Sequence, residues 1–260
     1  MKIAAIQFNA VAGEISRNLA KIEGLVNDAA ARGANLIVLP EICDIGYEMG
    51  QVVKLAEAFP NRTTDFLGEL ARKNNVIITA GLAEKKIDGI YNAAVTFDTS
   101  GNVAAAYHKT HLCRIPPFDE PKVFRSGSKI FVKEVEGLKL GFSICFDIRF
   151  PEVYRKLATE GAQIVLHPTA FPRSRIEQFE ICARARTIEN QFFFVSANLC
   201  SHSGGVEFGG CSMIVAPNGL VLKKASEIEE DIVIAEVDLS EVERQRRDVP
   251  VYSCRRPELY

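Results

Sequence analysis

The chain has 260 residues, of which 47% are hydrophobic and 25% are charged, and its 31 Lys and Arg against 33 Asp and Glu give a net charge of -2. This composition is ordinary for a water-soluble globular protein and excludes a disordered chain. The near-neutral balance gives no electrostatic reason to expect nucleic acid or a membrane surface as partner, and no run approaches the roughly 20 apolar residues that span a bilayer.

The first half of the chain predicts five strands and two helices. Short apolar runs that read as buried strands lie at residues 3–8, 36–39, 76–80, 93–97 and 103–107. Between the first two runs, residues 16–32 place Leu19, Ile22 and Val26 at helical spacing and stop before Gly33, so this segment predicts an amphipathic helix. A second helix is expected over residues 64–74.

The second half predicts a similar series. Apolar runs at residues 138–144, 164–166, 192–197, 211–215, 219–222 and 232–237 are expected to be strands. A helix over residues 152–160 opens directly after Pro151, a residue type favoured in a first helical turn, and a further helix is expected over residues 176–190. The arginine-rich segment from about 241 to 260 contains Pro250 and Pro257, so we expect an extended, irregular tail that is either frayed or docked on a partner subunit.

These elements predict the fold class. The apolar runs are continuous, as in strands that are buried on both faces. Each half runs strand, helix, strand, helix and then several strands, a weak internal repeat of topology. We therefore expect an α/β protein, a four-layer α-β-β-α sandwich with two mixed sheets packed face to face, forming a single domain over residues 1–260.

The cysteines and the N-terminus indicate the compartment. There are seven cysteines, an odd number that is widely spaced and contains no C-x-x-C pair, so free thiols are expected rather than a disulfide framework. The first residues lack the longer apolar run and cleavage site of a signal peptide, so we expect a cytoplasmic protein.

Three residues share a setting in which a polar side chain directly follows an apolar strand: Glu41, Lys109 and Cys145. Strand ends in α/β proteins collect at one crevice, so these residues can converge. Cleavage of an amide by a thiol requires a base, a nucleophile and a positive group for the oxyanion, which these residues and the peptide N–H of Phe146 would supply. The alternative is that Cys145 fills the core while Glu41 and Lys109 are surface charges.

The amino-acid sequence around these residues resembles the signature blocks of the nitrilase superfamily, the carbon–nitrogen hydrolases. The blocks are Leu39-Pro40-Glu41, residues 107–112 (YHKTHL) and residues 144–152 (ICFDIRFPE), with further similar blocks at 167–172, 184–191 and 210–219. The resemblance implies one carbon–nitrogen hydrolase domain of αββα fold with a Glu-Lys-Cys triad. In it Glu41 is the general base, Lys109 supports the oxyanion and Cys145 is the nucleophile.

The same resemblance implies roles for further residues. The second glutamate of the family falls best on Glu120, to hold the lysine, the substrate or water, unless it is a plain loop carboxylate. Arg149 lies where some relatives bind a substrate carboxylate, or it is a structural partner of Asp147. Tyr47 is expected to line the pocket or to serve packing alone. Members of this family are usually oligomers, so we expect a homodimer or a larger homo-oligomer.

The expected activity is thiol-dependent hydrolysis of a small aliphatic or ω-amide through an acyl-enzyme that releases ammonia. Nitrile hydrolysers tend to carry Trp-Glu after the cysteine, whereas Cys145-Phe146-Asp147 resembles the amidase and carbamoylase branches. The alternatives are an N-carbamoyl amine or amino-acid hydrolase, acyl transfer to another amine, and a non-catalytic scaffold of the same fold.

Two other kinds of site have less support. A papain-like pairing of the cysteine with His108 or His111 leaves the lysine without a role. A metal site at His108, His111 and Cys113 lacks a second ligand cluster. No phosphate-binding glycine motif is present, so a nucleotide site has no support. We therefore expect neither a cofactor nor a metal.

Overall fold

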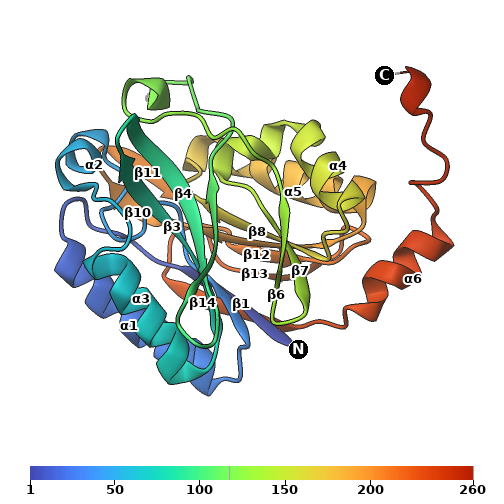
Figure 1. Cartoon of the computed structure of the whole chain (residues 1–260), viewed down its shortest axis with the longest axis horizontal. Coiled ribbons are helices and arrows are strands. Elements are labelled where there is room, and N and C mark those ends of the chain that lie inside the picture. Colours follow the sequence, from blue (N-terminus) through green and yellow to red (C-terminus); the bar gives the residue numbers. More distant parts are fainter. Residues whose placement is uncertain (117, 260) are drawn as a thin grey trace.

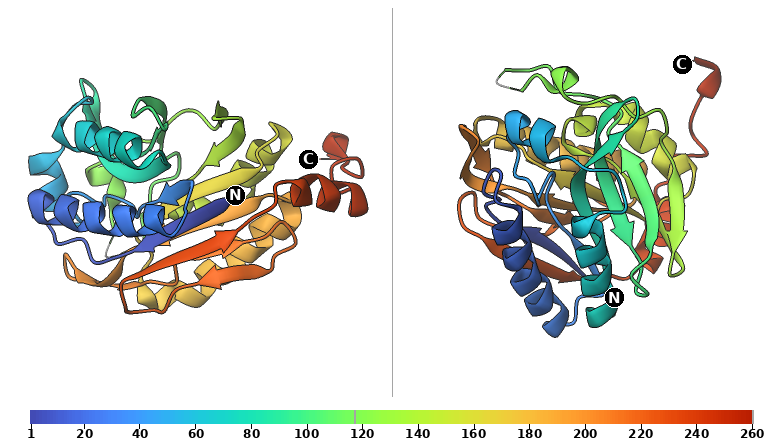
Figure 2. Two further views of the ribbon diagram at one scale, coloured as in Figure 1. Left: turned by 90° about the horizontal axis from the view of Figure 1, so that it is seen from below. Right: turned by 60° about the vertical axis from the view of Figure 1, so that its left-hand side comes forward.

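Two six-stranded mixed sheets pack face to face and carry helices on their outer faces (Figure 1). The structure is a computed structural model that describes residues 1–116 and 118–259. Figure 2 shows the layers from two further directions, with the helices of the first half and of the second half on opposite sides of the sheets. The α-β-β-α sandwich expected from the sequence is confirmed.

The first sheet has the strand order β14-β1-β2-β3-β4-β5. Its strands are β1 (Lys2–Gln7), β2 (Leu36–Val38), β3 (Ile77–Lys86), β4 (Gly89–Phe97), β5 (Val103–His108) and β14 (Asp231–Glu236). The neighbours β1, β2 and β3 are parallel, and the outer strands are antiparallel. The parallel connections require crossovers, which α1 (Ile15–Ala31) and α3 (Arg62–Asn74) provide.

The second sheet has the strand order β13-β12-β9-β8-β7-β6. Its strands are β6 (Val132–Val135), β7 (Leu138–Phe142), β8 (Ile164–Thr169), β9 (Phe193–Asn198), β12 (Met213–Val215) and β13 (Val221–Lys224). Again three central strands are parallel, joined by α4 (Pro151–Thr159) and α5 (Ile176–Asn190), and the outer strands are antiparallel. The two halves therefore repeat one topology, except that β14 from the second half completes the first sheet.

The alternation of side chains along β1 explains why its sequence is apolar throughout. Ile3 and Ala5 belong to the core between the two sheets, whereas Ala4 and Ile6 belong to the core under the helices of the first half. Successive side chains of a strand point to opposite faces, so a strand covered on both sides needs apolar residues at every position.

Several elements differ from the sequence-based expectation. The short helix α2 (Met49–Leu55) and the hairpin of β10 (Cys200–Ser203) with β11 (Val206–Gly209) were not predicted, nor was the edge strand β6. The arginine-rich segment is not irregular throughout, because α6 occupies Ser240–Asp248. Only Val242 of α6 is buried, so this helix has almost no apolar stripe for a sequence pattern to detect.

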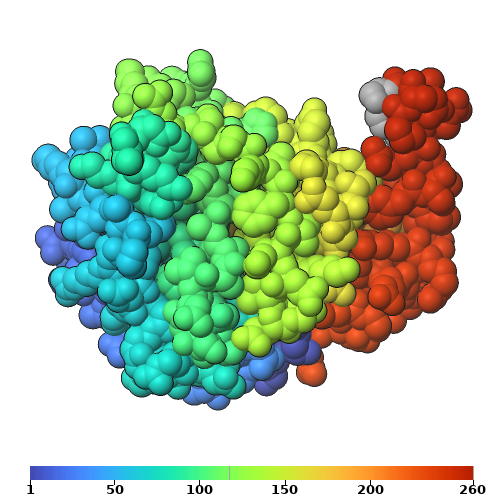
Figure 3. Space-filling model, viewed as in Figure 1, coloured from blue at the N-terminus to red at the C-terminus, as the bar shows by residue number. Residues whose placement is uncertain are grey.

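The C-terminal segment projects from the body of the molecule. Among the described residues after α6, Val249 and Tyr252 are hydrogen-bonded to Gln191 and Asn190 of the body, and a short 3₁₀ turn, Pro257–Leu259, lies beyond them. The space-filling view shows the C-terminal end projecting at one edge of the molecule (Figure 3). Within residues 1–116 and 118–259, no helix is long and apolar enough to cross a membrane.

Candidate active site

The three strand-end residues predicted to converge lie in one buried cluster. Glu41 follows β2, Lys109 follows β5, and Cys145 opens the 3₁₀ turn η2 (Cys145–Arg149) after β7. The Lys109 Nζ atom lies 2.8 Å from Glu41 Oε1, and neither side chain is exposed to solvent. Cys145 as a residue is 7% exposed, and its thiol interacts electrostatically with both charged groups.

The backbone around Glu41 joins the ends of the two sheets. The Glu41 N–H donates to the Thr169 carbonyl at the end of β8, at 3.3 Å, and the Gly81 N–H donates to the Pro40 carbonyl at 3.1 Å. A Cβ atom on Gly81 would lie 2.4 Å from the Glu41 Cα atom, so only glycine allows this approach. Glu41 is therefore in contact both with β3 of the first sheet and with the end of β8 in the second sheet, which also contains the strand before Cys145.

A strained turn presents Cys145. Its φ angle is +43°, a left-handed conformation that costs a non-glycine residue about 1–3 kcal/mol. The buried Asp147 carboxylate holds this turn, accepting hydrogen bonds from Ile144 N at 2.9 Å, His111 N at 3.0 Å and the Tyr107 hydroxyl at 2.8 Å. Asp147 thus links the cysteine turn by hydrogen bonds to the end of β5, and Lys109 is the first residue after β5.

Glu120 completes the cluster on the other side of the lysine. Its Oε1 atom accepts from Lys109 Nζ at 2.6 Å and from the Tyr47 hydroxyl, and its Oε2 atom accepts from Cys113 N at 2.5 Å. Of the three ammonium N–H groups of Lys109, Glu41 and Glu120 occupy two. One N–H therefore has no partner among the described residues and remains available to a bound molecule.

The two oxygens of Glu41 have different surroundings. Oε1 accepts from Asn92 Nδ2 at 2.6 Å and from Lys109, whereas the buried Oε2 has no hydrogen-bond partner among the described residues. A buried carboxylate oxygen without a donor is a strong proton acceptor, because ionisation there is poorly compensated.

The pKa shifts follow from burial and from these charges. Burial raises the pKa of the Glu41 carboxyl above its ordinary value, and the opposing effect of the Lys109 charge offsets this only in part. Burial and then the Glu41 charge raise the pKa of the Cys145 thiol well above its usual range, and the opposing effect of Lys109 is smaller. Burial would lower the pKa of Lys109, but the Glu120 and Glu41 carboxylates more than offset this and raise it. The lysine is therefore charged, and the resting thiol is protonated.

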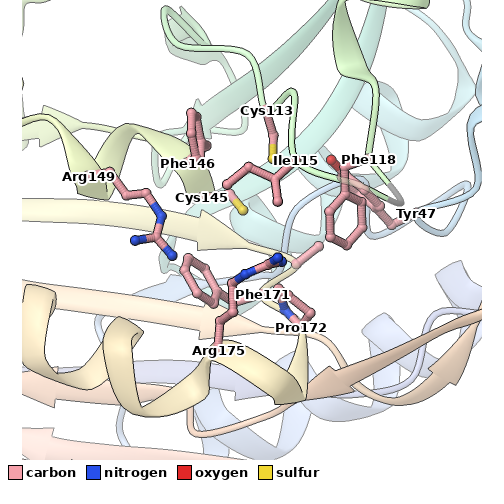
Figure 4. A pocket seen from close by; sticks show the side chains of 11 residues that line it. Tyr47, Cys113, Ile115, Phe118, Cys145, Phe146, Arg149, Phe171, Pro172 and Arg175 are labelled. Atoms are coloured by element: carbon pink, nitrogen blue, oxygen red, sulfur yellow. The ribbon is translucent and has the colours of Figure 1, made fainter.

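A pocket of about 330 Å³, its open mouth included, leads to Cys145 (Figure 4). Its lining residues are Tyr47, Cys113, Ile115, Phe118, Cys145, Phe146, Arg149, Ala170, Phe171, Pro172 and Arg175. The predicted residues Tyr47, Phe146 and Arg149 thus lie on the wall, whereas Glu41, Lys109 and Glu120 lie behind it.

One sequence-based alternative for Arg149 is wrong. It is not the structural partner of Asp147, whose oxygens are occupied by the groups of β5 and of the cysteine turn. Instead, Arg149 Nη2 donates to Gln178 Oε1 at 2.8 Å, and its guanidinium lies over the Phe171 ring, 5.7 Å from the centroid. It therefore faces the pocket.

The two histidines considered for other chemistries contact other carboxylates. His108 Nε2 bonds to Glu84 Oε2 at 2.5 Å, and His111 Nδ1 bonds to Asp147 Oδ1 at 3.0 Å. Neither lines the pocket of Cys145. Across the described part of the chain, no three His, Cys, Asp or Glu side chains are grouped so that they could hold a metal ion.

The sequence analysis named none of the apolar wall residues Ile115, Phe118 and Phe171 as site residues, and it also missed three residues with polar groups at the site. Asn92 donates to Glu41, the Thr169 hydroxyl lies beside the Cys145 sulfur and lowers its pKa, and Arg175 lines the pocket. Thr169 belongs to one of the recognised blocks, so its position could have been noticed. Asn92 and Arg175 lie outside these blocks and carry no local signal.

Comparison with known proteins gives consistent matches. The family model described as carbon–nitrogen hydrolase matches residues 2–247. A 2-oxoglutaramate amidase of Bacillus subtilis is 34% identical over 259 residues, covering 99% of this chain and 98% of the relative. A protein of Pyrococcus abyssi named nitrilase is 36% identical over 267 residues, covering 100% and 99%.

Two solved structures are also similar. Nit3 of Saccharomyces cerevisiae, a member of the nitrilase superfamily, has a TM-score of 0.91 at 27% identity, covering 98% of this chain and 96% of its own. An amidase from Nesterenkonia sp. AN1, which carries the product of Michael addition of acrylamide at its active-site cysteine, has a TM-score of 0.85 at 28% identity. That match covers 96% of this chain and 98% of the amidase.

Proposed function

The chain belongs to the carbon–nitrogen hydrolase family, and from this premise we propose that it hydrolyses a small ω-amide through an acyl-enzyme on Cys145. The observation that carries the proposal is the lysine held between two buried carboxylates beside the thiol, at 2.8 Å from Glu41 and 2.6 Å from Glu120. This arrangement offers a base, a nucleophile and a fixed positive charge at one pocket.

In the first step Glu41 acts as the general base. Its unpartnered Oε2 atom takes the proton of the Cys145 thiol while the sulfur attacks the amide carbon. Their raised pKa values suit this concerted transfer, because the thiol stays protonated until the substrate is bound. The free N–H of Lys109 and the peptide N–H of Phe146 then donate to the oxyanion.

The remaining steps return the proton. Protonated Glu41 gives its proton to the amide nitrogen, and the carbon–nitrogen bond breaks. Ammonia departs, and the acyl group remains bound to Cys145 as a thioester. Glu41 next removes a proton from water, and the resulting hydroxide attacks the thioester carbon. The carbon–sulfur bond breaks, Glu41 returns the proton to the sulfur, and the carboxylic acid leaves. Glu120, which also accepts from the Tyr47 hydroxyl, holds Lys109 in place throughout, so the positive charge needs no rearrangement as the oxyanion forms.

Substrate class follows from the pocket wall. Ile115, Phe118 and Phe171 offer apolar contact to a short carbon chain, and Arg149 offers a guanidinium that can bind a carboxylate bidentately. The name of the Bacillus subtilis relative, 2-oxoglutaramate amidase, supports a substrate that carries a carboxylate at one end and an amide at the other. An N-carbamoyl amino acid would use the same arginine and is the second candidate.

The test is ammonia release from a panel containing an ω-amide with a carboxylate, a neutral amide, an N-carbamoyl amino acid and a nitrile. We expect the ω-amide to react fastest and Cys145→Ala to lose at least about 10³-fold in kcat. The exposed Cys254→Ala is the control and retains activity. Added hydroxylamine should divert the thioester to a hydroxamate. Full activity of Cys145→Ala, or no hydroxamate, contradicts the mechanism.

We also propose a homodimer or larger homo-oligomer. Ile181 and Ile188 of α5 are 60% and 53% exposed, and Leu220, next to the Gly219 that faces Ile188, is 59% exposed. Such a patch, together with a C-terminal segment that projects from the body, suits contact with a second copy. Sedimentation equilibrium tests this, and a monomer mass at micromolar concentration contradicts it.

A further inference from the structure

Arg175 is a cation on the wall of the pocket. It ends the 3₁₀ turn η3 (Arg173–Arg175), is partly buried, and makes no ion pair or side-chain hydrogen bond to any residue within 1–116 and 118–259. Arg173, two residues earlier, is exposed and pairs with Glu207 at 2.7 Å and Glu227 at 3.2 Å. The charge of Arg173 is therefore balanced by two carboxylates, whereas no carboxylate of the described residues pairs with Arg175.

The turn that presents Arg175 is held firmly. Phe171 N donates to Asn198 Oδ1 at 2.8 Å, the Phe171 carbonyl accepts from Gly209 N at 2.9 Å, and Arg175 N donates to the Pro172 carbonyl at 3.1 Å. These contacts come from β9 and from the β10–β11 hairpin. The guanidinium thus starts from a fixed backbone, which reduces the entropy lost when it binds an anion.

Arg175 faces the same space as Arg149. The two side chains come from different elements, η3 and η2, and Figure 4 shows the Arg149 guanidinium on one side of the Phe171 ring and the Arg175 guanidinium on the other. Arg149 is already oriented by Gln178 and by the Phe171 ring. Both guanidinium groups line one pocket, so an anion bound between them is attracted by each.

The charges of the pocket are segregated along its depth. Behind Cys145 lie two carboxylates, Glu41 and Glu120, against the single ammonium of Lys109. The outer wall has two guanidinium groups and, among its described lining residues, no carboxylate. An anionic group is therefore favoured at the outer wall and disfavoured at the inner end.

We propose that Arg175 determines specificity by binding, together with Arg149, the carboxylate of an ω-amide substrate, so that the neutral amide end is the one delivered to Cys145. This inference rests on the proposed function and adds the residue that selects and orients the substrate. It also accounts for product release, because hydrolysis creates a second carboxylate next to Glu41 and Glu120, where it is repelled.

The test compares Arg175→Met with its matched control Arg173→Met, which removes the same charge from the same turn outside the pocket. The substrates are glutaramic acid and pentanamide, which has the same carbon chain without the carboxylate. Since a charge-assisted bidentate contact is lost, we expect Arg175→Met to raise KM for glutaramic acid by at least about 10-fold, with little change in kcat or in pentanamide hydrolysis. Arg173→Met should leave both substrates within about twofold of wild type.

A second measurement keeps the test independent of turnover. In Cys145→Ala protein, which lacks the nucleophile, glutaramic acid should bind at least about 10-fold more weakly when Arg175→Met is added, by calorimetry. Equal KM values in Arg175→Met and wild type, or equal losses in the Arg173→Met control, overturn the role of Arg175 and leave the amidase proposal intact. Failure of the wild-type protein to hydrolyse any amide overturns the proposed function itself.

Discussion

The buried carboxyl of Asp44 lets the pH dependence of stability be worked out from the structure. Asp44 lies in the segment that joins Glu41 to Tyr47, and its oxygens accept from Ile45 N at 2.8 Å and Thr63 Oγ1 at 3.0 Å. Burial, only partly offset by these two hydrogen bonds, raises the pKa of Asp44 to about 6. Asp44→Asn keeps the shape and the bond from Ile45 N, and its amide nitrogen can donate to Thr63 Oγ1, but it cannot ionise.

The magnitude and sign follow from linkage. The rise from the ordinary value of 3.8 to about 6 corresponds to about 3 kcal/mol, since each pKa unit is worth about 1.4 kcal/mol. Below the unfolded pKa the carboxyl is protonated in both states and its contribution to stability is fully present. As pH rises, the unfolded chain loses the proton first, so that contribution falls until the pH passes the folded pKa.

We therefore expect Asp44→Asn to gain stability over wild type as pH rises. The difference in unfolding free energy should grow by about 2–3 kcal/mol between about pH 4 and about pH 8. Urea denaturation at several pH values measures it. Glu134→Gln, on the exposed edge strand β6, is the control and should show no such trend. Parallel stability curves for Asp44→Asn and wild type would refute the reasoning.

Three further outcomes are expected. Lys109→Met should lose about 10²–10³-fold or more in kcat, measured on protein shown to be folded by circular dichroism, if its free N–H stabilises the oxyanion, and a loss below about tenfold would remove it from that role. The raised pKa of Glu41 predicts that kcat/KM rises with pH through a midpoint above the ordinary 4.5 of a glutamate, and a pH–rate profile with a midpoint at or below 4.5 contradicts the assignment of the base. Asp147→Ala leaves the buried donors of Tyr107, His111 and Ile144 without an acceptor, so urea denaturation should show that the unfolding free energy falls by at least about 3 kcal/mol. A fall of less than about 1 kcal/mol would contradict the role of Asp147 in holding the cysteine turn.

Much of the fold was predictable because its signals are local. Continuous apolar runs such as β1 and β8 identify strands covered on both faces, and the stripe of Leu19, Ile22 and Val26 identifies α1. The elements missed are those with weak local signals. The helix α2 buries only Val52, and α6 buries only Val242, so neither shows an apolar period.

The sequence by itself determined which chemical groups stand at the ends of the buried strands, because residue type and strand pattern are both written locally. Glu41, Lys109 and Cys145 were found in this way, and the structure brings them together. Only the tertiary structure decided the partners of each group. It assigned Asp147 to the clamp of the cysteine turn, left Arg149 and Arg175 facing the pocket, and buried Glu41 enough to raise its pKa. The physical reason is that a partner is chosen by distance across two packed sheets, and burial by everything that surrounds a side chain, and neither quantity is a property of neighbouring residues in the chain.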